Sequence, residues 1–367
     1  LEVVSDKISN GNKTWPIRRE KIAIFTIYSQ DAAENSYSKA LASLRCYGER
    51  TNYTVLTVKL DNLTSEQQMH CPHDQLLFKK HCLVAHTMDE NPHLDWFFVL
   101  DADTGVANPN HTLEEYIDPT VDFVFYERFF IWEVAAGNYI VKNTRFARKF
   151  LRRWAQMQYK LPRDPNVYHS ADNGAIHLIL LRTIFHDHPD VVEACTDAWY
   201  DNRFHAYVWC SIHHLRMRRC TKHFRILRRA HAWVIDRHIV LDYWSSDIFM
   251  QHGWKDDRID LAQPRLTWCL THVPKDCRPN GAWPLNWTRF LHRDQMRRLL
   301  TEADAQRQVS DGNFQAVFNL PQLPDIGDCW PKCELNDTSK FISPDRVRVT
   351  NRTIMQPTNE CYRLKME

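Results

Sequence analysis

Two aspartates separated by one residue, Asp101 and Asp103, directly follow an apolar run at residues 96–100. Carboxylate oxygens are the ligands that Mg²⁺ and Mn²⁺ prefer, and such a cation can keep open positions for phosphate oxygens. An Asp-x-Asp triplet alone also occurs in solvated turns. The preceding run predicts a buried strand, however, and open α/β sheets bind ligands at the carboxyl ends of their strands. We therefore predict a divalent metal site at Asp101 and Asp103. Ala102, between them, is predicted to contact the bound phosphate-bearing ligand.

A second polar group lies far downstream, in His252-Gly253-Trp254-Lys255. The His252 imidazole could complete the metal shell, and the Lys255 ammonium could meet a diphosphate as a point charge. In a chain with 19 histidines, the same tetrapeptide could instead be a surface turn. Because the aspartate pair is also present, we predict His252 as the third metal ligand.

Segments of strand and helix character alternate along the chain. Strands are predicted at residues 22–28, 53–60, 96–100 and 123–126, and helices at 36–47, 76–88, 143–159 and 172–183. This alternation predicts an α/β fold with a Rossmann-like, mostly parallel central sheet and flanking helices. Beyond about residue 255 the composition shifts to Pro, Trp and Cys without periodicity. We predict a lead-in at 1–20, a catalytic domain at 21–256 and an irregular, disulfide-stapled C-terminal appendage at 257–367.

The cysteines and glycan acceptor sites indicate an oxidising compartment. The 367 residues include eleven Cys, and seven Asn-x-Ser/Thr sequons begin at Asn12, Asn52, Asn62, Asn110, Asn286, Asn336 and Asn351. We expect disulfides among loop cysteines such as Cys269, Cys277, Cys329 and Cys333, although buried free thiols in a cytosolic protein are the alternative. No apolar run is long enough to span a membrane, and residue 1 does not begin a signal peptide. We expect a Golgi or ER lumenal protein whose type II membrane anchor or leader has been removed, or a secreted one.

Charge gives no sign of a nucleic-acid partner. The 47 Lys and Arg nearly balance the 45 Asp and Glu, so the chain has no strong global field. A basic stretch at residues 213–229 could face nucleic acid, but we expect a charged surface or a site for an anionic glycan.

The order of these motifs resembles a GT-A nucleotide-sugar glycosyltransferase over about residues 20–256. It is similar to the retaining galactosyl- and xylosyltransferases of the plant galactomannan type, and to a family of transferases expanded in nematodes. The resemblance rests on five blocks, at residues 21–28, 96–103, 136–143, 171–175 and 252–255.

The resemblance implies a metal-dependent transfer of a hexose, with galactose favoured, from a UDP-sugar to a glycan or glycoprotein acceptor. It implies Mn²⁺ or Mg²⁺ at Asp101, Asp103 and His252, with Lys255 on the diphosphate. Three further groups of residues would meet the donor: Thr26, Ile27 and Tyr28 at the nucleoside, Lys80 on a helix, and Gly137 with Asn138 at the sugar. Tyr28 could equally be a core residue, and Lys80 could lie on a solvated helix face.

Two carboxylates, Glu133 and Asp172, are the candidate catalytic residues. Retaining families of this type need no dedicated base, whereas an inverting enzyme would use one of these carboxylates. Asp172 could instead only cap its helix. Two alternatives to a transferase remain open, namely a secreted metallohydrolase using His205, His213 or His214, and a non-catalytic lumenal sugar-binding protein on the same fold.

Overall fold

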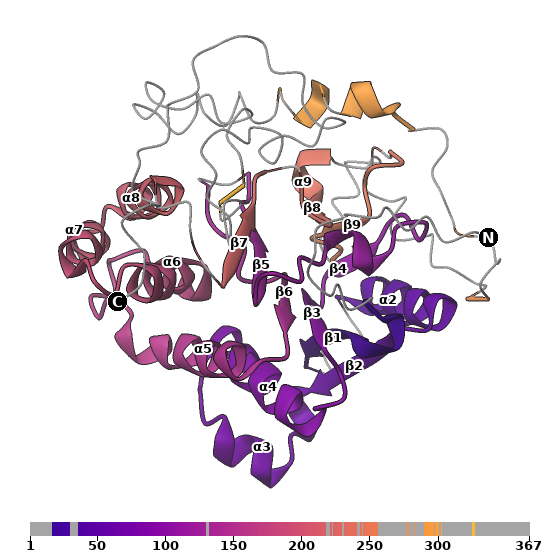
Figure 1. Ribbon diagram of the computed structural model, residues 1–367, viewed down its shortest axis with the longest axis horizontal. Coiled ribbons are helices and arrows are strands. Elements are labelled where there is room, and N and C mark those ends of the chain that lie inside the picture. The colour runs from indigo at the N-terminus through magenta and orange to yellow at the C-terminus, as the bar shows by residue number, and fades with distance from the viewer. Residues whose placement is uncertain are drawn as a thin grey trace, which may run out of the picture.

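The computed structural model describes residues 17–29, 36–129, 132–217, 221, 223–229, 231–240, 243 and 245–255, together with short pieces at 277–278, 283, 290–296, 298–300, 302 and 325–326 (Figure 1). Most of the predicted lead-in and C-terminal appendage lies outside the described residues, so those domain boundaries stay predictions. No helix in the described part is both long and apolar enough to cross a membrane.

A six-stranded sheet forms the centre of the molecule, in the order β2-β1-β3-β6-β5-β7. The strands are β1 (Ile22–Tyr28), β2 (Thr54–Lys59), β3 (Trp96–Asp101), β5 (Phe123–Tyr126), β6 (Tyr139–Lys142) and β7 (Phe224–Leu227). β1 pairs in parallel with β2 and β3, β5 pairs in parallel with β7, and β6 runs antiparallel to both of its neighbours. The predicted α/β class with a mostly parallel central sheet is confirmed.

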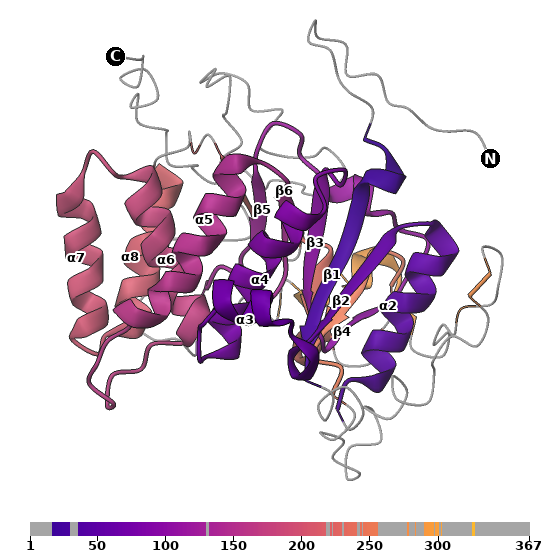
Figure 2. The ribbon, with the colours of Figure 1, turned by 90° about the horizontal axis from the view of Figure 1, so that it is seen from below.

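Helices lie on both faces of this sheet, and α3 and α7 pack on other helices. The longer described helices are α2 (Ser38–Thr51), α3 (Ser65–His70), α4 (Leu76–Glu90), α5 (Arg145–Ala155), α6 (Ala171–Ile184), α7 (Pro189–Tyr200) and α8 (Phe204–Met217). Phe25, Phe97 and Val99 pack in a core with α4, α5 and α6, whereas Ile24 and Phe98 pack in a second core with α2. Every residue of β1 is buried, because alternate side chains enter opposite cores. Figure 2 shows α4 and α5 in front of the strands. It shows α6, α7 and α8 grouped at the left of the view, next to α5.

A second, three-stranded sheet closes the edge where β3 ends. It contains β4 (Thr104–Val106), β9 (Met250–His252) and β8 (Val234–Asp236), in that order, and α9 (Arg237–Val240) follows β8. β4 follows β3 after a two-residue turn and pairs antiparallel with β9, so that Thr104 lies opposite His252. This pairing brings a segment about 150 residues downstream to the end of β3.

Several predicted elements agree closely with the structure. β1 and β5 have the predicted bounds, and the helix predicted at 143–159 is α5 followed by a 3-10 turn at Gln156–Lys160. β4, β6, β7, β8 and β9 were not predicted as strands; each has only three or four residues, and none is uniformly apolar as the four-residue β5 is.

The basic stretch at 213–229 is not the exposed charged surface that we expected. In the described part of this stretch, Arg228 and Arg229 are buried, and Arg216 forms an ion pair with the buried Glu127. Arg225 forms ion pairs with Asp118 and Asp325. The guanidinium groups of Arg216 and Arg225 thus neutralise carboxylates of the protein itself instead of presenting a field to solvent.

Three disulfides join described cysteines: Cys46–Cys277, Cys71–Cys82 and Cys195–Cys210. Cys277 was among the cysteines expected to pair, whereas Cys269, Cys329 and Cys333 lie outside the described residues. The sequon residues Asn52, Asn62 and Asn110 are all exposed, as glycan attachment requires. Disulfides of this number are typical of a lumenal or secreted environment.

Candidate functional site

Figure 1 shows β3, β4 and β9 close together where the two sheets meet. Three side chains converge there. One ligand atom each of Asp101, Asp103 and His252 lies within 4.8 Å of the other two. His252 Nε2 is 3.7 Å from Asp101 Oδ2 and 3.3 Å from Asp103 Oδ1. Two carboxylate oxygens and one imidazole nitrogen form a donor set that suits Mn²⁺ and leaves coordination positions for other oxygens. The structure thus brings together the three residues that the sequence predicted as metal ligands.

Asp101 is positioned by the segment that precedes β6. The side-chain oxygen of Asn138 accepts hydrogen bonds from the Asp101 backbone N (3.1 Å) and from Thr104 Oγ1 (2.9 Å). At Gly137, an added Cβ would lie 2.0 Å from Asp101 Oδ2. In the structure, the close approach that the glycine permits is therefore to the Asp101 carboxylate. Gly137 and Asn138 shape the Asp-Ala-Asp turn.

His252 is held by a carboxylate that the sequence analysis did not identify. Asp236 Oδ1 lies 2.8 Å from His252 Nδ1, so the imidazole presents Nε2 to Asp101 and Asp103. The two residues are register partners in the parallel β8–β9 pair. A carboxylate on the second ring nitrogen is the usual way in which a protein orients a metal-binding histidine. Asp236 is the last residue of a three-residue strand and belongs to no recognisable motif, so no sequence signal pointed to it.

The electrostatics of this cluster favour a positive charge at its centre. Burial lowers the pKa of His252, but Asp103 and Asp236 outweigh it and raise that pKa to about 10. Burial raises the pKa of Asp103, but His252 and Lys255 lower it to about 2. The imidazolium therefore supplies the positive charge that a metal ion would supply, and binding of the metal through Nε2 requires the loss of that proton.

The His-Gly-Trp-Lys segment folds back over the Asp-Ala-Asp turn. The backbone N–H groups of Gly253 and Trp254 both donate to the Asp103 carbonyl oxygen, at 3.0 and 2.8 Å, and Gly253 has a φ of 100°. This left-handed conformation suits glycine. Lys255 Nζ lies 3.4 Å from Asp103 Oδ2. The His252 imidazole and the Lys255 ammonium, the two groups predicted at this site, thus both contact the aspartate pair.

Lys80 lies at the same site and not on a solvated helix face. Its side chain is 3% exposed, and its Nζ lies 3.0 Å from Asp101 Oδ1 and 3.5 Å from Asp172 Oδ2. Although burial lowers the pKa of Lys80, the two aspartates raise it above its ordinary value, so the ammonium stays charged. Lys80 links Asp101 to Asp172.

Asp172 does not cap its helix. The N-cap residue of α6 is Ser170, whose side chain makes no capping hydrogen bond, and Asp172 is buried within the first turn. His81 Nε2 lies 3.3 Å from Asp172 Oδ2, and the His81 ring stacks on Trp154 at 3.5 Å between centroids. Burial raises the pKa of Asp172, but Lys80 and His81 bring it below its ordinary value. His81 is a further site residue that the sequence analysis missed.

Glu133 lies in a separate polar cluster, which is connected to His252 through Arg128 and Asp236. Its Oε1 accepts a hydrogen bond from Ser170 Oγ at 2.7 Å, and its Oε2 is 3.4 Å from Arg128 Nη1. Arg128 Nε is in turn 3.3 Å from Asp236 Oδ2. Burial raises the pKa of Glu133 to about 7, although Arg128 and Ser170 oppose this. A chain of contacts thus connects Glu133 through Arg128 and Asp236 to His252.

The predicted nucleoside segment, Thr26, Ile27 and Tyr28, ends β1 beside the Asp-Ala-Asp turn. Ile27 is the register partner of Asp101. Tyr28 is 7% exposed and packs with Leu41 and Ala102, which is the environment of a core tyrosine. Thr26 Oγ1 is buried without a hydrogen-bond partner.

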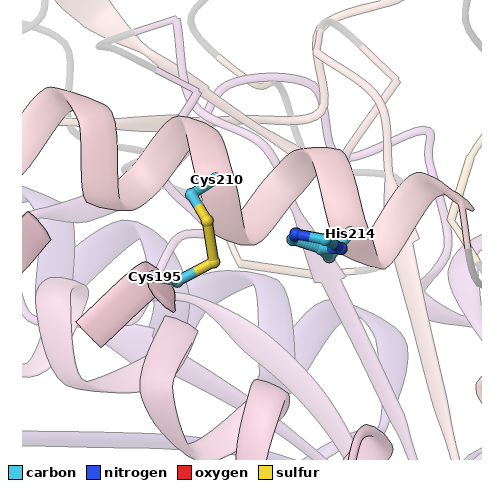
Figure 3. A group of neighbouring side chains, drawn as sticks. All are labelled: Cys195, Cys210 and His214. Carbon is cyan, nitrogen blue, oxygen red and sulfur yellow. A yellow bond between two sulfur atoms is a disulfide. The ribbon is translucent and has the colours of Figure 1, made fainter. Parts of the chain in front are cut away.

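The histidines of α8 do not join the aspartate pair. The group that contains Asp101 and Asp103 and could hold a metal ion is completed, among the described residues, by His252. His214 lies near Cys195 and Cys210, but Figure 3 shows the two sulfur atoms joined in a disulfide, so neither is available as a thiolate ligand. This arrangement gives no support to a hydrolase site built from His213 or His214.

Comparison with known proteins gives a family and several structures with similar folds. No curated protein sequence matches the chain. A glycosyltransferase involved in glycosylation of the major capsid of PBCV-1 is 13% identical, with a TM-score of 0.40 over 63% of this chain and 92% of that one. The glycosyltransferase GlyE of Streptococcus pneumoniae TIGR4 is 13% identical, with a TM-score of 0.31 over 43% of this chain and 42% of that one. A197 from STIV is 11% identical, with a TM-score of 0.24 over 41% of this chain and 73% of that one. A family model described as a protein of unknown function, DUF273, matches residues 44–266, more than half of the sequence, and the chain belongs to that family.

Proposed function

We propose that this protein is a metal-dependent glycosyltransferase that takes a hexose, with galactose favoured, from a UDP-sugar and passes it to a glycan or glycoprotein acceptor. The observation that carries the proposal is the convergence of Asp101, Asp103 and His252 within metal-binding distance of one another, with two lysines beside them. Oxygen-rich metal sites flanked by lysines are suited to diphosphates, because metal and ammonium together match the charge of the two phosphates.

Bound Mn²⁺ or Mg²⁺ would neutralise the charge that develops on the departing nucleoside diphosphate. Lys255 and Lys80 both contact the aspartate pair, and their ammonium groups would hold the phosphate oxygens in the same place. Asn138 and Gly137 fix the turn that carries the metal ligands, so the donor meets a preorganised site.

The surroundings of Asp172 and Glu133 favour the retaining mechanism. Asp172 is charged and held by Lys80 and His81, which makes it a weak base and a good fixed acceptor for a hydroxyl group. Glu133 has a pKa of about 7, as a general base needs, but it is 1% exposed and bonded to Ser170. A retaining transfer needs neither as a base, because the departing phosphate oxygen can take the acceptor proton.

The compartment proposed for this activity is the Golgi or ER lumen, with a type II membrane anchor, or the exterior of the cell. Three disulfides and exposed sequons at Asn52, Asn62 and Asn110 support an oxidising, glycosylating compartment. A non-catalytic lumenal sugar-binding protein on this fold is the competing proposal, and the experiment below separates the two.

The test is a calorimetric titration with UDP in the presence and absence of Mn²⁺, followed by a screen for UDP release from UDP-galactose, UDP-glucose and UDP-xylose. We expect UDP binding that depends on Mn²⁺ and that Asp103→Ala abolishes, because Asp103 is both a metal ligand and a partner of Lys255. Asp201→Ala is the matched control, since Asp201 pairs with Arg203 on the surface.

Full metal-dependent turnover in Asp103→Ala would refute the metal assignment. Binding of UDP with Mn²⁺ but no transfer from any donor would favour the sugar-binding protein.

A further inference from the structure

A second group of potential metal ligands lies on α3 and α4, outside the site described above. Glu66 and His70 are four residues apart on α3, and His86 and Glu90 are four residues apart on α4. Residues spaced in this way lie on the same face of a helix. The disulfide Cys71–Cys82 joins the end of α3 to α4, so these two faces meet.

Three of these side chains are close enough for a single ion to join them, and Glu90 lies beside His86. One ligand atom each of Glu66, His70 and His86 lies within 4.8 Å of the other two. The two imidazole rings stack with centroids 5.3 Å apart, and His86 Nε2 is 3.4 Å from Glu90 Oε1. Ligand atoms around a tetrahedral Zn²⁺ are about 3.3 Å apart, so small side-chain rotations would bring the group to that geometry. Glu66 and His70 are exposed and able to make them.

The hydrogen bonds of the two histidines leave nitrogen atoms suited to a metal. His70 Nδ1 lies 3.0 Å from the Glu66 carbonyl oxygen, which fixes the proton on Nδ1 and leaves the lone pair on Nε2. His86 is 9% exposed, and its buried Nε2 makes no hydrogen bond, although the Glu90 carboxylate lies 3.4 Å away. A buried polar atom without a partner is unfavourable, and coordination to a cation would remove that cost.

We propose that Glu66, His70, His86 and Glu90 form a second metal site, selective for Zn²⁺ or a similar transition metal. Two imidazoles and two carboxylates are a common ligand set for Zn²⁺, whereas Mn²⁺ prefers the oxygen-rich site at Asp101 and Asp103. The ion would connect α3 to the C-terminal end of α4, the helix that carries Lys80, at a second point beyond the Cys71–Cys82 disulfide.

The experiment measures Zn²⁺ and Co²⁺ binding to the full-length chain in which Asp103→Ala has removed the first site. Zn²⁺ affinity comes from competition with a chromophoric chelator, and visible absorption of the Co²⁺ form reports tetrahedral coordination. We expect one bound Zn²⁺, a rise in melting temperature on its addition, and a Zn²⁺ affinity that falls at least about tenfold in His70→Gln and in Glu66→Gln. Both changes are at exposed positions, so the fold is preserved.

His93→Gln is the matched control, because His93 is also exposed and lies outside the group. Zn²⁺ affinity that is equal in His70→Gln, Glu66→Gln and His93→Gln would overturn the proposal, as would the absence of Zn²⁺ binding to Asp103→Ala protein. None of these measurements uses UDP, so the result is independent of the transferase activity.

Discussion

Replacement of Gly137 by alanine should separate the metal site from the stability of the fold. The three atoms nearest to an added Cβ at this position all belong to the Asp101 carboxylate, and the nearest, Oδ2, would be 2.0 Å away. No backbone atom is among them. The carboxylate is the end of a side chain that can rotate, so the protein can accommodate the methyl group by moving Asp101.

The size of that movement sets the expected loss of metal affinity. To reach ordinary van der Waals separation, Oδ2 must move by about 1.5 Å. A metal–ligand distance can deviate by only about 0.2 Å from its normal value. After such a movement, Asp101 Oδ2 can no longer bind a metal ion in its original position. We expect Mn²⁺ affinity to fall by about 10- to 100-fold, or about 1.4–2.7 kcal/mol. The free energy of unfolding should change by only about 1 kcal/mol, because the lost contact with Lys80 is offset by the lower entropy of the unfolded alanine chain.

The assay is a Mn²⁺ titration of UDP binding by calorimetry, with thermal unfolding of the same samples in the absence of metal. A double-mutant cycle with Asp101→Asn provides the control. If Gly137→Ala acts through Asp101, it should weaken metal binding far less when Asp101 is already changed.

Mn²⁺ affinity within twofold of wild type in stably folded Gly137→Ala would show that Asp101 is not a metal ligand. Equal losses in the presence and absence of Asp101→Asn would show that the glycine acts by another route.

Three further predictions concern groups around the site and the compartment. Asp236→Asn should weaken Mn²⁺ binding by about 10-fold or more, because His252 Nδ1 loses its charged partner. The same titration measures this affinity, and an unchanged value would contradict the proposed role of Asp236 in orienting His252. Burial raises the pKa of Glu133 to about 7, so its contribution to stability is fully present below the ordinary glutamate pKa and is lost as pH rises through about 7. Glu133→Gln should therefore gain up to about 3 kcal/mol relative to wild type between pH 5 and pH 8 in denaturant unfolding, and a constant difference would disprove the buried neutral carboxyl. At least six of the eleven cysteines should resist alkylation in denaturant until a reductant is added, and eleven reactive thiols without reduction would contradict the three disulfides.

The predictions that the structure confirmed rest on long local patterns. The apolar runs of β1 and β3 are buried on both faces, so their composition alone identified central strands. The position of Asp101 and Asp103 at the end of β3 followed from that assignment, and His252 was suggested by the chemistry of an incomplete ligand set. Local periodicity also identified α2, α4, α5 and α6 to within a few residues.

The residues that complete the site depend on contacts between distant parts of the chain. Asp236 reaches His252 only because two three-residue strands pair in parallel, and strands of that length have no period in the sequence. The same limit explains the wrong expectation for the arginines of residues 216–229, and it explains why a solvated helix face stayed open as the alternative for Lys80. In sequence a charged side chain indicates solvent, but in the structure these groups are buried against carboxylates contributed by other elements. The sequence by itself determined several of the buried strands and helices, because these follow from local hydrophobic pattern; the tertiary structure decided which charges meet, because buried partners such as Arg216 and Glu127 are 89 residues apart in the chain.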